Sequence, residues 1–141
     1  MRLLCLRIVL VVLGLVLAGA AAAELVLVTD ADGAIKAVSR EEAEQLYLGR
    51  LSALKDGTAV RLLDLPPGPA RDAFYLELTG KNATQVRAYW SRMVFTGRAR
   101  PPREVAGPAA LRAALRSDPH LIGYLPGHEL VPGLRVLLRL P

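Results

Sequence analysis

One stretch of this chain decides the expected fold: Gly80-Lys81-Asn82-Ala83-Thr84-Gln85-Val86-Arg87-Ala88-Tyr89-Trp90, then Phe95-Thr96-Gly97-Arg98, then Ile122-Gly123-Tyr124. Asn82 can cap a helix, with Gln85 in the third position as its reciprocal partner. Apolar residues follow at helical spacing and predict a single stripe, made of Val86, Tyr89, Trp90, Met93 and Val94. Gly97 ends the helix. We therefore expect an amphipathic helix with Trp90 buried against a sheet.

The segments before this helix alternate between strand and helix patterns. Leu25–Val28 is a short continuous apolar run, typical of a strand buried on both faces. Ser39-Arg40-Glu41-Glu42 predicts a capping box, and the helix that follows it ends at Gly49. Residues 59–65 predict a second strand. Pro66-Pro67-Gly68-Pro69 then separates that strand from a helix over residues 70–78.

The segments after the central helix continue this alternation. Gly107-Pro108 predicts the start of a last helix, with proline in its first turn, and Asp118-Pro119 ends it. Residues 120–125 and 134–138 predict two final strands. Strands that alternate with helices indicate an α/β fold in which helices flank one sheet.

The first 23 residues have the features of an export signal. Arg2 and Arg7 are followed by the aliphatic run Ile8–Ala18, and Ala21-Ala22-Ala23 offers small residues for cleavage before Glu24. The run from Ile8 is shorter than the roughly 18–20 apolar residues that span a bilayer. We expect cleavage after Ala23, with a retained membrane anchor as the alternative. Cleavage would leave one periplasmic domain over residues 24–141.

The composition argues against several classes of protein. The single cysteine, Cys5, lies in the expected signal, so the domain has no disulfide or thiolate chemistry. The formal net charge of +5 includes Arg2 and Arg7, and this modest charge with few aromatic residues argues against nucleic-acid binding. His120 and His128 lack a third ligand at metal-site spacing. We therefore expect no metal, no cofactor and no enzymatic activity.

Taken together, the order of the motifs resembles the phosphate-type substrate-binding proteins of ABC importers, within the type 2 periplasmic binding protein superfamily. The segments that carry this resemblance are Ser39-Arg40-Glu41-Glu42, Leu46-Tyr47-Leu48-Gly49-Arg50, Asp56-Gly57, Arg71 with Phe74, Tyr89-Trp90, Phe95 with Gly97, and Ile122-Gly123-Tyr124. The resemblance covers residues 25–138. A chain of this size resembles one lobe of those two-lobed proteins, which implies a central mixed β-sheet flanked by helices.

The resemblance also implies where a ligand would bind. In full-length relatives two lobes close on an oxyanion, held by hydroxyl groups, backbone amides at helix starts, an arginine and an aspartate. The matching loop here, Pro66-Pro67-Gly68-Pro69-Ala70, contains no hydroxyl group, and its prolines remove N–H donors. The candidate ligand-binding residues that remain are Gly68, Arg71 and Asp64. The alternative for Arg71 is a solvated side chain that pairs with its neighbours Asp72 and Tyr75.

Two functions stay open at this point. The first is binding of phosphate or another small oxyanion for, or accessory to, an ABC uptake system. The second is a protein-interaction module derived from a lobe that no longer binds phosphate. The partner would be an ABC permease or an envelope sensor protein, with membrane contact only through that partner. Arg98, Arg100 and Arg103 form either an anion or partner patch or a solvated loop.

Overall fold

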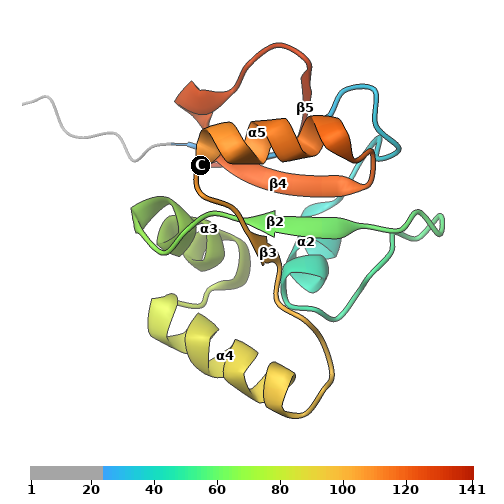
Figure 1. The fold of residues 1–141 in the computed structure, drawn as a ribbon. Helices are drawn as coiled ribbons and strands as arrows, with labels where there is room; N and C mark the ends of the chain where they lie inside the picture. The colour runs from blue at the N-terminus through green and yellow to red at the C-terminus, as the bar shows by residue number, and fades with distance from the viewer. Residues whose placement is uncertain (1–23) are drawn as a thin grey trace, which may run out of the picture.

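The computed structural model describes residues 24–141, so the expected export signal lies outside the described residues. Five strands form one mixed sheet in the order β3-β2-β4-β1-β5 (Figure 1). The strands are β1 (Leu25–Asp30), β2 (Arg61–Asp64), β3 (Arg103–Glu104), β4 (Leu121–Pro126) and β5 (Leu134–Leu140). β2 is parallel to β3 and β4, whereas β1 is antiparallel to β4 and β5. This arrangement is the mixed sheet that the sequence led us to expect.

Helices cover both faces of this sheet (Figure 1). The helices of the domain are α2 (Arg40–Tyr47), α3 (Pro69–Thr79), α4 (Ala83–Phe95), α5 (Pro108–Ser117) and the 3-10 helix η1 (Gly127–Glu129), of which α4 lies at an outer end, away from the sheet. α5 lies on one face, where Gly123 of β4 leaves room for Leu111: a Cβ at Gly123 would come within 2.9 Å of that side chain. α3 lies on the opposite face, because successive strand residues point to opposite sides. There Phe74 stacks on Tyr124 with ring centroids 3.6 Å apart.

The core lies between the sheet and the helices and draws on both ends of the described chain. Leu25–Val28 are all buried, which confirms the prediction of a strand enclosed on both faces. Tyr47 of α2 joins Phe74 and Tyr124, with ring centroids 4.8 Å and 6.0 Å away in edge-to-face contacts. Such contacts add to the burial of large aromatic surfaces. The aromatic cluster therefore fixes α2 and α3 on the same face of β4.

Both predicted capping boxes are present. The backbone N–H of Glu42 donates to Ser39 Oγ at 3.0 Å, and that of Gln85 donates to Asn82 Oδ1 at 2.9 Å. In each case the side chain in the third helical position also accepts from the cap backbone. These reciprocal bonds satisfy N–H groups that have no partner inside a helix. The starts of α2 and α4 are therefore set by local sequence.

Three elements differ from the sequence prediction. β2 begins at Arg61, because Ala59 instead forms an isolated bridge with Ala53. β3 was not expected, since a two-residue strand carries no apolar periodicity. The apolar stripe of α4 is shorter than predicted, since Val94 is 53% exposed. Trp90 is buried as predicted, but its ring packs at Gly49 in the turn after α2, where the sequence had predicted the sheet. Val94 borders an open groove rather than another element. Among residues 24–141, no helix is both long and apolar enough to cross a membrane.

Candidate functional site

The carboxyl ends of three strands meet at one edge of the sheet. β2, β3 and β4 are parallel, so they end on the same side. A four-residue loop, Leu65–Gly68, leads from β2 into α3, and Val105–Gly107 leads from β3 into α5. Both helices therefore begin at this edge, as Figure 1 shows. Ligands of open α/β sheets commonly bind outside the carboxyl ends of strands.

The two helices that begin at this edge lack side-chain caps, in contrast to α2 and α4. Gly68 precedes α3 and Gly107 precedes α5, and in each case proline occupies the first helical position. At these two starts, the backbone N–H groups of Ala70, Arg71, Ala109 and Ala110 have no acceptor among the described residues. Free N–H groups and the helix dipole together favour an anion. The edge therefore has two sets of donors suited to negative charge.

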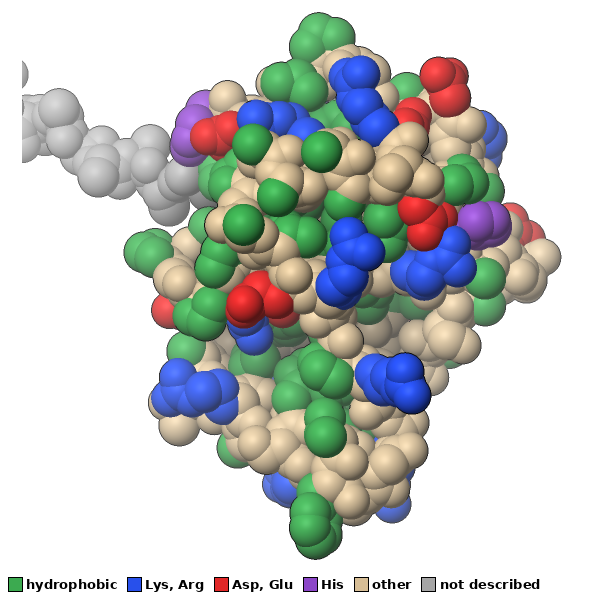
Figure 2. Space-filling view, in the orientation of Figure 1, with side chains coloured by type: hydrophobic (Ala, Val, Ile, Leu, Met, Phe, Trp, Pro, Cys, Tyr) green, Lys and Arg blue, Asp and Glu red, His purple; other side chains and the backbone are tan. Residues whose placement is uncertain are grey.

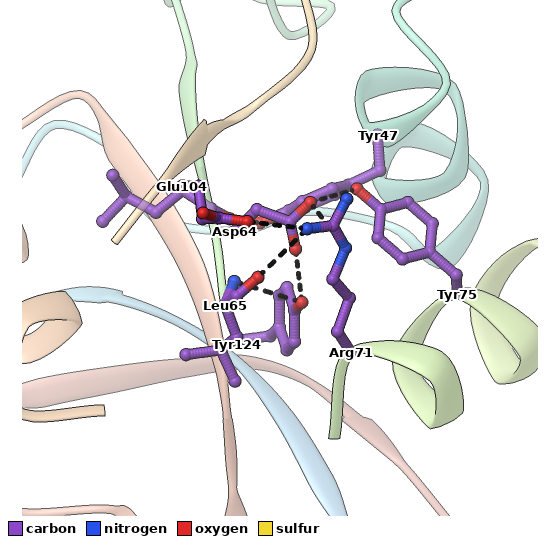
Figure 3. A network of polar contacts seen from close by, with 8 residues as sticks. Tyr47, Asp64, Leu65, Arg71, Tyr75, Glu104 and Tyr124 are labelled. Atoms are coloured by element: carbon purple, nitrogen blue, oxygen red, sulfur yellow. Dashed lines mark hydrogen bonds and ion pairs between the residues drawn. The ribbon is translucent and has the colours of Figure 1, made fainter. Parts of the chain in front are cut away.

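Asp64, the last residue of β2, is the buried centre of a polar network at this edge (Figure 3). The Tyr75 hydroxyl donates to Asp64 Oδ2 at 2.8 Å, and the Tyr124 hydroxyl donates to Oδ1. Arg71 Nε lies 3.5 Å from Oδ2. The backbone N–H of Leu65 donates to the Tyr124 hydroxyl oxygen at 3.2 Å. Each carboxylate oxygen of Asp64 therefore has a donor, as a buried charge requires.

Burial shapes the protonation of this network. It raises the pKa of Asp64 above its ordinary value, and the hydrogen bonds from Tyr124 and Tyr75 and the charge of Arg71 oppose this rise only in part. Burial, followed by the nearby Asp64 carboxylate, also raises the pKa of Tyr75 and of Tyr124. The two hydroxyls therefore remain protonated donors at neutral pH. They hold Asp64 in place and do not act as bases.

The charge of Arg71 is compensated by two carboxylates from different strands. Its Nε faces Asp64, and its Nη1 lies 3.1 Å from Glu104 Oε1. Its Nη1 also donates to the Leu65 carbonyl at 3.4 Å, and its guanidinium lies 6.0 Å from the Tyr75 ring centroid. Glu104 is 33 residues away in the chain, and no local pattern indicates it as a partner. The structure therefore joins Arg71 to Asp64 and Glu104 as well as to the ring of Tyr75, one of the two neighbours that local spacing had suggested, and gives it no salt bridge with the other, Asp72.

An open groove of about 740 Å³ adjoins this network. Asp64, Arg71 and Glu104 line its polar part together with Arg87 and Ser91 of α4, and apolar side chains of α4 and the Pro101-Pro102 loop line the rest. The indole Nε1 of Trp90 is buried and has no hydrogen-bond acceptor among the described residues. Gly68 does not line this groove and lies at the start of α3. Of the three predicted ligand residues, the structure thus brings Asp64 and Arg71 into contact and sets Gly68 beside them at the helix start.

The arginines of the proline-rich loop lie along a second open groove, of about 660 Å³. Its basic lining residues are Arg50, Arg61, Arg98, Arg100 and Arg103. Arg61 is held by a bidentate contact with Asp118, at 2.8 Å and 2.7 Å. Pro101-Pro102 line both grooves, so the loop separates these arginines from Arg71. Arg50 and Arg61 were missed in the sequence because they come from segments far from the loop.

Comparison with known proteins identifies the fold. No protein-family model and no curated protein matches this sequence. Solved structures that match include an ABC-type phosphate transport receptor from Vibrio cholerae, with 11% identity and a TM-score of 0.61. A putative phosphate ABC transporter substrate-binding protein with bound phosphate from Clostridium perfringens has 14% identity and a TM-score of 0.61. PstS from Borrelia burgdorferi has 15% identity and a TM-score of 0.59.

These similarities cover 82% of this chain but only 45% to 47% of the three matched proteins. The chain thus spans less than half the length of the proteins that it matches. Identities of 11% to 15% establish the fold and leave the ligand open. The single-lobe α/β architecture that the motifs implied is confirmed. Residues 24–141 form a PstS-like, phosphate-binding-protein-like lobe.

Proposed function

We propose that this chain is an exported, non-enzymatic binding-protein lobe that holds a small oxyanion such as phosphate, for or accessory to an ABC uptake system. The observation that carries the proposal is the pair of uncapped helix starts at one sheet edge, those of α3 and α5. The other two α-helices have complete capping boxes. Each of these two starts leaves two backbone N–H groups free at the same edge of the sheet, and free N–H groups at a helix start favour an anion. The fold shared with phosphate-binding proteins supports the same ligand class.

The affinity of this lobe alone should be low. A two-lobed site surrounds a desolvated anion with charge-assisted hydrogen bonds, and this chain spans less than half of such a protein. Proline at the start of α3 removes one donor, and Arg71 already pairs with Asp64 and Glu104. We expect a phosphate Kd no tighter than roughly millimolar, which corresponds to about 4 kcal/mol. Tighter binding would need a second protein surface, such as a permease or an envelope sensor.

A second candidate function is a protein-interaction module that no longer binds phosphate. The observation in its favour is the double pairing of Arg71, which neutralises the arginine in the first turn of α3. The loop Pro66–Pro69 also favours this function, because it has no hydroxyl group to bind phosphate. In this case the groove beside Arg71 would receive part of the partner instead of an anion.

Titration calorimetry with phosphate, in a phosphate-free buffer at low and moderate salt, separates these functions. We expect weak, salt-sensitive binding that Arg71→Ala abolishes. Glu104→Gln should strengthen binding about threefold or more, because it removes one carboxylate that neutralises Arg71. Arg139→Gln, at an exposed arginine paired with Glu24, is the matched control and should change nothing.

Each result of this titration bears on one of the two functions. Micromolar stoichiometric binding would contradict the weak site and indicate that a second copy completes it. No heat from wild type or Glu104→Gln, at roughly ten times the expected Kd, would favour the interaction module.

Export is tested separately by intact-mass analysis of periplasmic and membrane fractions. The basic start, the aliphatic run and the alanine-rich end of residues 1–23 support a chain that begins at Glu24. A full-length chain held in the inner membrane would contradict cleavage and favour the anchor.

A further inference from the structure

The positive charge of this domain is concentrated on one part of it. Residues 24–141 carry 16 of the 18 basic residues, since Arg2 and Arg7 precede them, and all 13 acidic residues. No acidic residue lies between Glu77 and Glu104, whereas six basic residues do. They are Lys81, Arg87, Arg92, Arg98, Arg100 and Arg103. This segment therefore carries a formal charge of +6, and the rest of the described chain carries −3.

These six side chains are not neutralised within the fold. Neither these six residues nor Arg50 forms a salt bridge with another residue in 24–141. Basic residues elsewhere commonly do: Arg112 pairs with Glu129 at 2.7 Å, and Arg61 pairs with Asp118. In Figure 2, Lys and Arg side chains border the α4 part of the visible face, where no acidic side chain appears. Lys36, Lys55, Arg116 and Arg135 also form no salt bridge, but they lie in the part of the described chain whose formal charge is −3, so the excess of positive charge is local to the α4 segment.

Large apolar side chains are exposed among these charges. Phe95, at the end of α4, is 91% exposed, and its neighbour Val94 is 53% exposed. Leu51, which is 42% exposed, lines the same groove as Arg50, Arg98 and Arg100. Of the four large hydrophobic residues that are exposed in residues 24–141, these are three. We name the combined surface the α4 corner: Lys81, Arg87, Arg92, Arg98, Arg100, Arg103 and Arg50, with Leu51, Val94 and Phe95.

We propose that the α4 corner binds the surface of an anionic phospholipid membrane directly. Guanidinium groups pair with phosphate oxygens through fixed, often bidentate, hydrogen bonds. Basic residues near an anionic leaflet are attracted to it, and apolar side chains among them enter the boundary between headgroups and acyl chains. The inference does not depend on phosphate binding at the sheet edge. It also differs from the expectation that only a partner protein brings this domain to a membrane.

The shape of the α4 corner favours a membrane over an acidic protein. Figure 1 places α4 at an outer end of the domain, away from the sheet. Phe95 is almost fully exposed and stands beside Arg92 and Arg98 on a shared open groove. A projecting apolar side chain needs a matching pocket in a protein partner. A fluid bilayer accepts the same side chain without a preformed pocket, so the corner as it stands suits lipid.

Vesicle sedimentation with residues 24–141 tests this proposal. That segment contains the whole described sheet and core, and using it keeps the apolar run Ile8–Ala18 out of the assay. The probes are phosphatidylcholine vesicles with and without about one third phosphatidylglycerol. We expect binding to the anionic vesicles only, weakening as salt rises. Free glycerol phosphate at matched phosphate concentration should compete poorly, because it offers no acyl boundary to Phe95.

Three variants locate the contact. Removing charge by Arg98→Gln, Arg100→Gln and Arg103→Gln together should weaken binding at least tenfold. Phe95→Ser should weaken it roughly fivefold without changing the net charge. The matched control removes three charges elsewhere, by Lys36→Gln, Arg116→Gln and Arg139→Gln, and should bind within about twofold of wild type. Thermal unfolding of each variant confirms that it is folded.

A fluorescence measurement separates insertion from mere attraction. In Phe95→Trp, the new indole should shift to shorter wavelength on anionic vesicles, while the buried Trp90 gives a constant background. If the triple-arginine variant and the control variant lost vesicle binding equally, binding would depend on net charge alone, and the proposal would be overturned. Absence of binding to anionic vesicles at low salt would also overturn it and would leave an acidic protein as the partner of this surface.

Discussion

Trp90 shows at the scale of one residue how α4 is held to the rest of the domain. Its side chain is 8% exposed and packs against the turn after α2. A Cβ at Gly49 would come within 2.8 Å of Trp90 Cη2 and of Ala99 Cβ. Gly49 also has φ of 69°, in the left-handed region that L side chains rarely adopt. Glycine is therefore required here both by backbone conformation and by packing.

Gly49→Ala should destabilise the domain more than Gly97→Ala. Gly97 follows α4 with nearly the same φ, 67°, but nothing lies within 4 Å of an added Cβ. We expect about 1 kcal/mol for Gly97→Ala from backbone strain, and a further 1–3 kcal/mol or so for Gly49→Ala from overpacking. Urea unfolding measures both. If both variants lost the same free energy of unfolding, the Trp90 indole would have to be loosely packed, contrary to its burial.

Asp64→Asn should change how stability depends on pH. Because burial raises the pKa of Asp64 in the folded protein above its value of about 3.9 in the unfolded chain, folding favours the protonated carboxyl. Its contribution to stability is then fully present below the unfolded pKa and is lost as pH rises through the folded pKa. The free energy of unfolding of wild type, relative to Asp64→Asn, should therefore fall as pH rises above about 4. Urea titrations at several pH values measure this difference, and a rise with pH would contradict it.

At the level of single elements, α4 is the α-helix of residues 24–141 that buries the smallest fraction of its residues. Of its 13 residues only Val86 and Trp90 are buried. One side-chain hydrogen bond joins it to the residue that follows α2, from the Tyr89 hydroxyl to the Leu48 carbonyl at 2.5 Å. With so little buried surface, the start of this helix depends on its own cap. Local opening of α4 is therefore expected to need less free energy than opening of the sheet.

Asn82→Ala should destabilise α4 selectively. It removes the acceptor for the Gln85 N–H and should cost about 1 kcal/mol. Hydrogen exchange should accelerate for the amides of α4 and not for those of β1, which lies between β4 and β5 in the sheet. Ser39→Ala is the matched control and should accelerate exchange in α2 instead. A uniform acceleration across the domain would show that α4 opens only with global unfolding.

At the scale of the whole molecule, one core joins the elements. β1 is the first strand of the described chain and β5 is the last. The two strands pair along six residues of β1, so the two ends of the described chain lie side by side in the sheet. The core cluster includes side chains from both ends, Leu25 and Leu140. Long-range pairing of this kind makes unfolding of a small domain cooperative.

Residues 24–141 should therefore unfold in one transition. For 118 residues we expect an unfolding enthalpy of about 80 kcal/mol near 60 °C. Scanning calorimetry should give equal calorimetric and van't Hoff enthalpies. A separate transition at lower temperature, lost in Trp90→Ala, would instead identify α4 as an independent unit.

Residue types and their spacing were enough to predict the local features of this protein. The capping boxes at Ser39 and Asn82, the buried strand Leu25–Val28 and the burial of Trp90 all follow from residue type and periodicity over a few positions. The lobe fold was implied by the resemblance of the motif order to phosphate-type substrate-binding proteins. Hydrophobic periodicity and capping depend on neighbours in the chain, so they can be found without knowing the tertiary structure.

The partners of the charged residues and the make-up of the exposed surfaces depend instead on how distant segments pack together. Parallel pairing places Asp64 opposite Glu104, and this brings both carboxylates to Arg71. The packing of α4 against the turn after α2 likewise brings Arg50 to the arginines of the proline-rich loop, and leaves Val94 uncovered. These outcomes depend on which strand lies beside which and on where a helix overhangs its neighbours. Local periodicity carries no information about strand neighbours or helix overhang, because both are set when distant segments pack into one core.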